Sequence, residues 1–386
     1  MVQRQISQIT KELAVKYPFV VITGPRQSGK TTLTKKLFPD YDYVSLEELD
    51  NREFARQDPR GFIATYPDRV IIDEVQRVPE LLSYLQTHSD NVGEEGMYIL
   101  TGSQNMLLMD AVDQSLAGRA GMLTLLPFSH QEMMVGGICP KSVEEEIFKG
   151  ALPRVYDKQI SPVTYYSNYI KTYVERDVRM LKNISDLSTF TRFLKLCAGR
   201  VGQLLNMASL ANDCGISVPT AKAWLSVLEA SFVVHFLRPD YNNFSKRLVK
   251  TPKLYFCDTG LACNLLEIAS TKQLSSHYLK GGLFENLVVN EMLKSEYNSG
   301  CLPQLSFWRD SNGNEIDLLR TRNGVQTAIE IKSGQTFSTD YVKGLRFWSQ
   351  MSGNTPDNCV VVYAGSAPMQ TSDCALIPWT QIGRLV

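Results

Sequence analysis

The sequence predicts an α/β protein: a parallel-sheet core, then a helical connector, a helix-turn-helix segment and a second α/β domain. From residue 17 to about 135, short apolar runs rich in β-branched residues alternate with helical stretches, as is typical of a covered parallel sheet. A glycine-containing turn joins the first run to a helix, and helical and β-type runs return together after about residue 278.

Five apolar runs are the expected strands of the first sheet: Phe19–Thr23, Tyr43–Ser45, Val70–Asp73, Met97–Thr101 and Met122–Leu126. A chain of 386 residues is long enough for two or three domains of ordinary size. We expect the core in residues 1–135, a helical lid or connector in 136–190, a winged helix in 191–277 and the last domain in 278–386.

The turn after the first strand fits the pattern GxxxxGK[ST]. Its residues are Gly24, Pro25, Arg26, Gln27, Ser28, Gly29, Lys30 and Thr31, and Thr32 follows in the next helix. In this pattern backbone N–H groups turn inward around phosphates, Lys30 neutralises the β and γ oxygens, and Thr31 offers a hydroxyl to Mg²⁺. The helix from Lys30 to about Phe38 adds its positive end. We therefore predict that ATP and Mg²⁺ bind here.

The strand that begins at Val70 ends in two acids, Asp73 and Glu74. Asp73 is expected to hold Mg²⁺ through water, and Glu74 to polarise the water that attacks the γ-phosphate. An apolar strand that ends in acids is common, but the phosphate loop upstream favours this interpretation.

Two further residues are candidates for the same reaction. Ser103 follows the strand that begins at Met97 and lies where ligands of open α/β sheets bind; it is expected either to sense the γ-phosphate or to cap the next helix. Arg119 precedes the last strand of the core. It is either an arginine finger, acting within its subunit or on a neighbour, or one half of a structural ion pair.

The segment 191–277 contains a helix-turn-helix pattern around Gly215, with Ser217 as the cap and Pro219 near the start of the second helix. Two β-type runs, Val233–Leu237 and Lys253–Phe256, are the expected wing. The segment from Arg238 to Lys253 contains one acid, Asp240, and the aromatic residues Tyr241 and Phe244. Its five cations are Arg238, Lys246, Arg247, Lys250 and Lys253. This composition is suited to DNA phosphates, although a solvated loop explains it equally well.

The last domain carries two carboxylates and a lysine on what reads as a hairpin. Asp317 lies on its first strand and Glu330 on its second, where Lys332 points to the same face as Glu330; Glu285 lies on the preceding helix. Such carboxylates can bind Mg²⁺, and the lysine can position the activated water. The set predicts phosphodiester chemistry, with Asp317 and Glu330 as metal ligands, or a nuclease-like fold that only binds or assembles. It resembles the PD-(D/E)xK nuclease core, and this resemblance implies Glu285 as a further metal ligand from the helix.

Four of these motifs together resemble the prokaryotic AAA+-type ATPases that carry a DUF4143 C-terminal region. They are GPRQSGKT (24–31), IIDEVQRVPE (71–80), LTGSQN (100–105) and SLAGR (115–119). The resemblance spans nearly the whole chain. It implies an AAA+ core, a winged helix, a PD-(D/E)xK nuclease-like domain and a homo-oligomeric ring, with a hexamer among the ring sizes.

Composition adds few constraints. Lys plus Arg and Asp plus Glu each total 40, so any attraction to DNA must be local. The eight cysteines form no CxxC pair, and no run is long and apolar enough for a membrane span. A cytoplasmic protein without a membrane partner is the expectation.

Three functional hypotheses follow. The first is an oligomeric ATPase that couples ATP turnover to action on DNA. The second is a nucleotide-gated switch or scaffold that recruits a protein partner, with a catalytically silent nuclease-like domain. The third is an endonuclease that its ATPase domain regulates.

Overall fold

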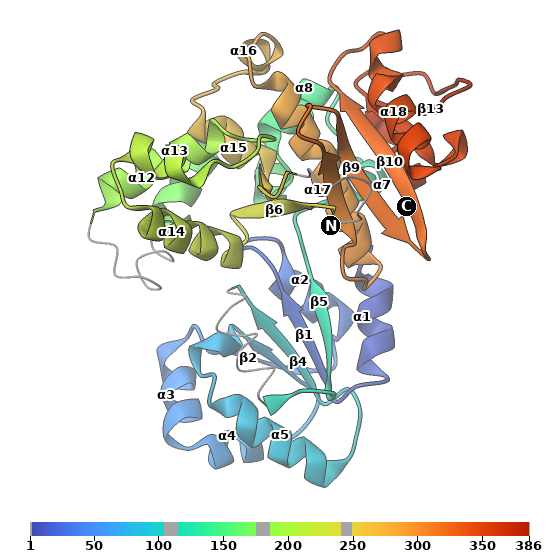
Figure 1. Cartoon of the computed structure of the whole chain (residues 1–386). Helices are drawn as coiled ribbons and strands as arrows, with labels where there is room; N and C mark the ends of the chain where they lie inside the picture. The colour runs from blue at the N-terminus through green and yellow to red at the C-terminus, as the bar shows by residue number, and fades with distance from the viewer. Residues whose placement is uncertain (1, 104–114, 175–185, 241–248, 386) are drawn as a thin grey trace. The chain divides into compact units, whose positions relative to one another are not determined.

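The computed structural model describes residues 2–103, 115–174, 186–240 and 249–385. The chain divides into two compact units, each described here by itself (Figure 1). Unit 1 comprises Met1–Phe128 with Ala230–Phe232 and Glu296–Cys301, and unit 2 comprises Ser129–Glu229, Val233–Ser295 and Leu302–Val386. In the described part of the chain, no helix has the length and apolar character needed to cross a membrane.

Unit 1 is built on a five-stranded parallel sheet in the order β2-β3-β4-β1-β5. Its strands are β1 (Phe19–Thr23), β2 (Asp42–Ser45), β3 (Val70–Asp73), β4 (Tyr98–Gly102) and β5 (Ala120–Thr124). All five expected runs form strands. The last begins two residues earlier than expected, because Ala120 already pairs with Phe19 of β1.

Helices cover both faces of this sheet, because its strands are apolar on both sides. On one face Val20 and Ile99 pack with α1 (Ser7–Ala14) and α2 (Lys30–Leu37). On the other face Val21 and Leu100 pack with α3 (Leu49–Gln57), α4 (Pro59–Thr65) and α5 (Leu81–Val92). The carboxyl ends of β1, β3 and β4 therefore share one open edge.

Unit 2 begins with short helices. These are α7 (His130–Val135), α8 (Val143–Lys149), α9 (Pro153–Asp157) and α10 (Pro162–Tyr169), followed by a π-helical turn (Ile170–Val174). A helical segment was expected here.

Three helices follow: α12 (Leu187–Ala198), α13 (Met207–Cys214) and α14 (Val218–Ala230). Gly215, with φ 72°, ends α13, and the hydroxyl of Ser217 accepts the Thr220 N–H at 3.2 Å at the start of α14. The glycine turn and the serine cap lie where the sequence predicts them. Strands β6 (Val234–Pro239) and β7 (Lys253–Phe256) then pair antiparallel.

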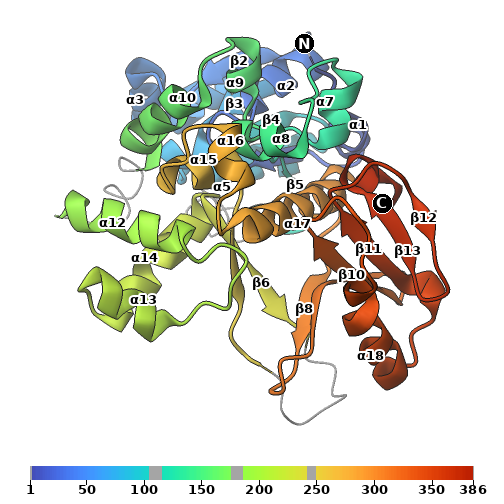
Figure 2. The ribbon, with the colours of Figure 1, turned by 90° about the horizontal axis from the view of Figure 1, so that it is seen from above.

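The hairpin of β6 and β7 does not stand alone as a wing. It ends an eight-stranded sheet in the order β12-β13-β11-β10-β9-β8-β6-β7, and β6 pairs parallel with β8 (Figure 2). The other strands are β8 (Leu305–Arg309), β9 (Glu315–Arg322), β10 (Val325–Lys332), β11 (Cys359–Tyr363), β12 (Met369–Gln370) and β13 (Ala375–Pro378). The expected divisions near residues 190 and 277 thus fall inside one compact unit.

The remaining helices of unit 2 include α15 (Thr259–Leu265), α16 (Thr271–Ser275), α17 (Lys280–Asn298) and α18 (Lys343–Ser352). Residues of α17 join the buried apolar cluster that also contains β7 and α12. The sequence predicts a helix from Phe284 to Ser295, and α17 extends beyond this range at both ends.

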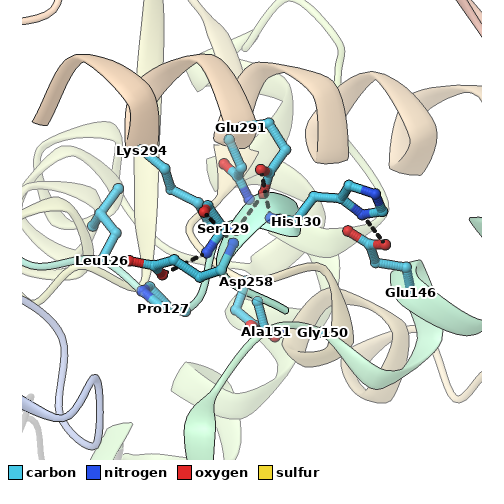
Figure 3. Close-up of polar contacts among 12 residues, drawn as sticks. Leu126, Pro127, Ser129, His130, Glu146, Gly150, Ala151, Asp258, Glu291 and Lys294 are labelled. Carbon is cyan, nitrogen blue, oxygen red and sulfur yellow. Dashed lines mark hydrogen bonds and ion pairs between the residues drawn. The ribbon is translucent and has the colours of Figure 1, made fainter. Parts of the chain in front are cut away.

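Buried polar contacts hold the start of unit 2 to α17 and α15 (Figure 3). The backbone N–H of His130 donates to Glu291 at 2.8 Å, and Lys294 donates to the same carboxylate at 2.7 Å. The His130 ring contacts Glu146 of α8 at 2.8 Å. In a second contact, Asp258 accepts the N–H of Ala151 at 2.8 Å. Buried charges with such partners fix helix positions rather than mark a reactive site.

Candidate nucleotide site

The loop between β1 and α2 has backbone angles that favour glycine at two positions. Gly24 has φ 146°, and a Cβ there would lie 2.2 Å from the carbonyl oxygen of Leu125. Gly29, with φ 96°, lies directly before α2. Any other residue at either position would therefore strain the backbone. The loop wraps around the Lys30 side chain, whose Nζ donates to the carbonyl oxygens of Gly24 and Pro25 at 2.9 Å each.

Lys30 is buried, and burial lowers the pKa of its ammonium to about 8, although the charges of Glu74 and Asp73 oppose this shift. Beside it the hydroxyl of Ser28 is fully buried without a hydrogen-bond partner among the described residues. A buried cation and a buried free hydroxyl in one loop are suited to a phosphate. These residues fit ATP.

Asp73, at the end of β3, accepts hydrogen bonds from three hydroxyl groups. Thr31 and Tyr43 donate to its Oδ2 at 2.9 Å each, and Thr101 donates to its Oδ1. The donors come from α2, β2 and β4, so Asp73 lies where the loop and the neighbouring strands meet. A hydroxyl beside a carboxylate is the usual protein contribution to a Mg²⁺ site on a nucleotide.

Glu74, directly after β3, adopts the left-handed conformation, with φ 56° and ψ 45°. Ser103 donates to Glu74 Oε2 at 2.9 Å, and Gln76 donates to the same oxygen at 2.5 Å. A strained backbone at a reactive carboxylate is a recurrent feature of functional sites. The sequence does not predict this bond between Ser103 and Glu74. The segment that Ser103 is expected to cap as the alternative lies outside the described residues.

Arg119 lies at the other end of the sheet. Its guanidinium bonds both oxygens of Asp90 in α5, at 2.6 and 3.0 Å, and its carbonyl accepts the N–H of Phe19 at the start of β1. A strand of five residues spans about 17 Å, so Arg119 cannot reach the phosphates bound by its own loop. The ion pair expected as the alternative is present.

Several contacts to the site have no local sequence signal. Arg4 is buried and donates to the carbonyl oxygens of Ser28, at 2.7 Å, and Leu126, at 2.6 Å, so it supports the phosphate loop from the chain's start. Tyr43 and Thr101 are ordinary strand residues in the sequence. Only the parallel order of the strands brings them to Asp73.

The four candidate residues of the last domain also lie together. Asp317 accepts the N–H of Ile331 at 2.8 Å and the ammonium of Lys332 at 3.3 Å, and Lys332 also bonds Glu330. Strands β9 and β10 form the expected hairpin, with Asn323 and Gly324 both at positive φ in its turn.

The position of Lys253 differs from the sequence-based expectation that it belongs to a basic wing. The basic composition of the wing assigned it to phosphate contacts, but its side chain is only 3% exposed and lies among the acids of the last domain. Its Nζ contacts Glu285 at 2.7 Å, Glu315 at 2.5 Å and Asp317 at 3.8 Å. The reason is that β7 belongs to the same sheet as β9, which carries Glu315 and Asp317, while Glu285 lies on α17. Lys253 is therefore not part of a DNA-binding surface.

Burial and crowding shift the pKa values of this cluster. Burial raises the pKa of Glu285 to about 7 although Lys253 opposes this, and burial and the nearby Asp317 charge raise the pKa of Glu330 well above its usual range. Burial would also raise the pKa of Asp317, but Lys332 and Lys253 outweigh it and the pKa falls below its usual value.

The expected Mg²⁺ does not fit this cluster as the structure arranges it. The oxygens of Glu285 and Asp317 that would bind a metal face the ammonium of Lys253 instead. Glu330 faces Lys332. The donor set is that of a magnesium site, but each of the three carboxylates already has a lysine ammonium beside it.

Of the other four cations of the predicted wing, two lie in the described residues and two do not. Arg238 and Lys250 are exposed, as is Lys222 on α14. Lys246 and Arg247, with Tyr241 and Phe244, lie outside the described residues.

Unit 1 has the features of a P-loop domain: a parallel sheet, and a phosphate-binding turn between its first strand and a helix. Comparisons with family models agree. Residues 16–134 match the AAA domain model, residues 140–272 match the domain of unknown function DUF8612, and residues 280–382 match the domain of unknown function DUF4143. The chain thus carries an AAA-type domain followed by a DUF4143 domain.

Two curated relatives are similar over most of the chain. The uncharacterized proteins Rv2008c of Mycobacterium tuberculosis and Mb2031c of Mycobacterium bovis are each 29% identical over 325 residues, which is 83% of this chain and 71% of theirs. Among solved structures, the Walker-type ATPase PABY2304 of Pyrococcus abyssi matches with a TM-score of 0.42 and 15% identity over 68% of this chain and 94% of its own. AMPPCP-bound DnaA of Aquifex aeolicus matches with a TM-score of 0.28 and 14% identity over 58% and 85%.

Proposed function

We propose that this protein binds and hydrolyses ATP with Mg²⁺, and that Lys30, Thr31, Asp73 and Glu74 perform the reaction. The observation that carries the proposal is the convergence of these side chains at one sheet edge, with Thr31 bonded to Asp73 and Ser103 bonded to Glu74. Lys30 neutralises the phosphates, Thr31 and Asp73 hold the metal, and Glu74 orients the attacking water.

The position of Arg119 is suited to a role between subunits. It is too far from its own loop, yet it is partly exposed at the sheet's other end, where a neighbouring copy could present its nucleotide. Its pairing with Asp90 holds the guanidinium in one orientation. We therefore propose a homo-oligomer in which Arg119 completes the partner's site.

Mixing two inactive variants tests the role of Arg119. Arg119→Ala and Glu74→Gln are each expected to lose ATP turnover, and their mixture to regain part of it, because one interface combines an intact Arg119 with an intact Glu74. Asp90→Ala is the matched control, since it breaks the same ion pair but keeps the arginine. If ATP turnover fell by the same small amount in Arg119→Ala and Asp90→Ala, Arg119 would have only a structural role.

DNA is the first candidate for what ATP turnover acts on. The support is modest: a helix-turn-helix with exposed Lys222, and the exposed Arg238 and Lys250 on either side of the segment 241–248. The second candidate is a nucleotide-gated switch that recruits a protein partner. The paired acids of the last domain favour this second function over the regulated endonuclease, because the ammonium of Lys253 lies between Glu285 and Asp317, two of the carboxylates expected to hold the metal.

The rate of ATP hydrolysis with and without DNA separates these two candidates. If DNA is the target, duplex or single strands should raise the rate several-fold, and an Arg238→Ala/Lys250→Ala variant should lose this stimulation. Lys272→Ala, an exposed lysine on α16, should keep it. Slow turnover that no DNA changes would favour the switch.

A further inference from the structure

We propose that the ammonium group of Lys253 is the resident cation of the acidic cluster formed by Glu285, Glu315, Asp317 and Glu330, and that it excludes a divalent metal ion from the position between Glu285 and Asp317. The last domain then has a nuclease-like arrangement of acids but hydrolyses no phosphodiester bond. The inference concerns unit 2 alone and does not depend on ATP hydrolysis in unit 1.

The contacts of Glu285 carry the first step. Its Oε1 accepts Lys253 Nζ at 2.7 Å and the Tyr255 hydroxyl at 2.5 Å, and both donors come from β7. A Mg²⁺ ion would need this oxygen at about 2.1 Å. An ammonium and a dication cannot share that position, because their charges repel at such short range.

Lys253 is fixed in place by the strand that carries it. On one side it pairs with Leu237 of β6, and on the other side the next residue, Leu254, exchanges backbone hydrogen bonds with Gly202 and Gln203 at 2.8 and 3.2 Å. Its Nζ also lies 5.5 Å from the centre of the Phe307 ring. The backbone of Lys253 is therefore held on both sides, and its buried side chain ends among the acids.

The charges of the cluster are nearly balanced. Three cations face its four carboxyl groups: Lys253, Lys332, which contacts Asp317 and Glu330, and Arg309, which bonds Glu315 at 2.6 Å. A nuclease site keeps unpaired carboxylates to attract its metal. Here little negative charge remains for a dication.

On one side α18 packs closely against the cluster. A Cβ at Gly344 of α18 would lie 2.4 Å from Glu330 Oε1 and 2.8 Å from the Glu315 carbonyl oxygen. The helix thus approaches the acids as closely as glycine permits, and leaves no room for a further ligand between Gly344 and Glu330.

Mn²⁺ binding to the full chain without nucleotide tests the proposal, with free Mn²⁺ followed by electron paramagnetic resonance. The unchanged chain and Asp317→Asn should take up equal amounts. Lys253→Met should gain a Mn²⁺ site, and Lys253→Met/Asp317→Asn should lose it again. Lys253→Arg keeps the charge and should gain none.

Two results would overturn the proposal: Mn²⁺ uptake by the unchanged chain that Asp317→Asn abolishes, or a folded Lys253→Met that gains no site. If Lys253→Met does not fold, the comparison of the unchanged chain with Asp317→Asn decides alone. Nicking of supercoiled plasmid in Mn²⁺ by the unchanged chain, absent in Asp317→Asn, would likewise contradict it. ATP turnover, measured in parallel, reports separately on unit 1.

Discussion

Replacement of Lys30 by alanine is expected to abolish ATP turnover. In the structure Lys30 is surrounded by its own loop, and it is the only lysine within that loop. Each hydrogen bond between a charged group and a phosphate is worth roughly 1.5–3 kcal/mol, so the loss of two such bonds lowers turnover and ATP affinity by about 10²–10⁴-fold. Hydrolysis of ATP and binding of a fluorescent ATP analogue measure both.

The matched control for Lys30→Ala is Lys36→Ala. Lys36 lies on the same helix, α2, but is exposed. It should keep wild-type turnover and affinity. A melting temperature close to that of the unchanged chain would show that Lys30→Ala still folds, and full turnover in that variant would contradict the assignment of the nucleotide site.

Glu74→Gln is expected to separate ATP binding from hydrolysis. The glutamine keeps the size of the side chain and an oxygen that can accept from Ser103, but it cannot hold the attacking water as a base. Removal of a general base costs about 10²–10⁴ in rate. Turnover should fall by that factor, while the affinity for ATP stays near that of the unchanged chain.

Glu80→Gln controls for the loss of a negative charge near this edge of the sheet. Glu80 is half-exposed and pairs only loosely with Arg56, at 3.6 Å. It should change neither rate nor affinity. If Glu74→Gln retained turnover, another group would have to activate the water, and the left-handed backbone at Glu74 would have a purely structural cause.

The parts predicted well from sequence are those encoded by contiguous residues. The turn from Gly24 to Thr31, the acids at the end of β3 and the Asn323-Gly324 hairpin each depend on local backbone demands, such as positive φ at Gly29 and Gly324. The periodicity of the apolar runs likewise predicted the strands of the first sheet, because residues buried on both faces must be apolar.

Two site residues have contacts that only the tertiary structure shows. Arg119 lies at the sheet edge opposite its own phosphate loop, and only the parallel pairing of β5 with β1 reveals this. Ser103 bonds Glu74, although the two belong to different strand ends. Neither relation has a fixed spacing along the chain.

The sequence by itself determined that the chain has a phosphate loop with two acids downstream, a helix-turn-helix, and a hairpin with a D…ExK pattern, because each arises from neighbouring residues. Only the tertiary structure decided that Arg4 supports the loop and that Lys253 belongs to the acidic cluster and not to a wing. The physical reason is that both contacts join segments far apart in sequence: Arg4 bonds Leu126, and the pairing of β6 with β8 joins the β6–β7 hairpin to the sheet of the last domain. The partners of a charged side chain therefore come from distant segments of the chain, and the composition of its own segment does not predict them.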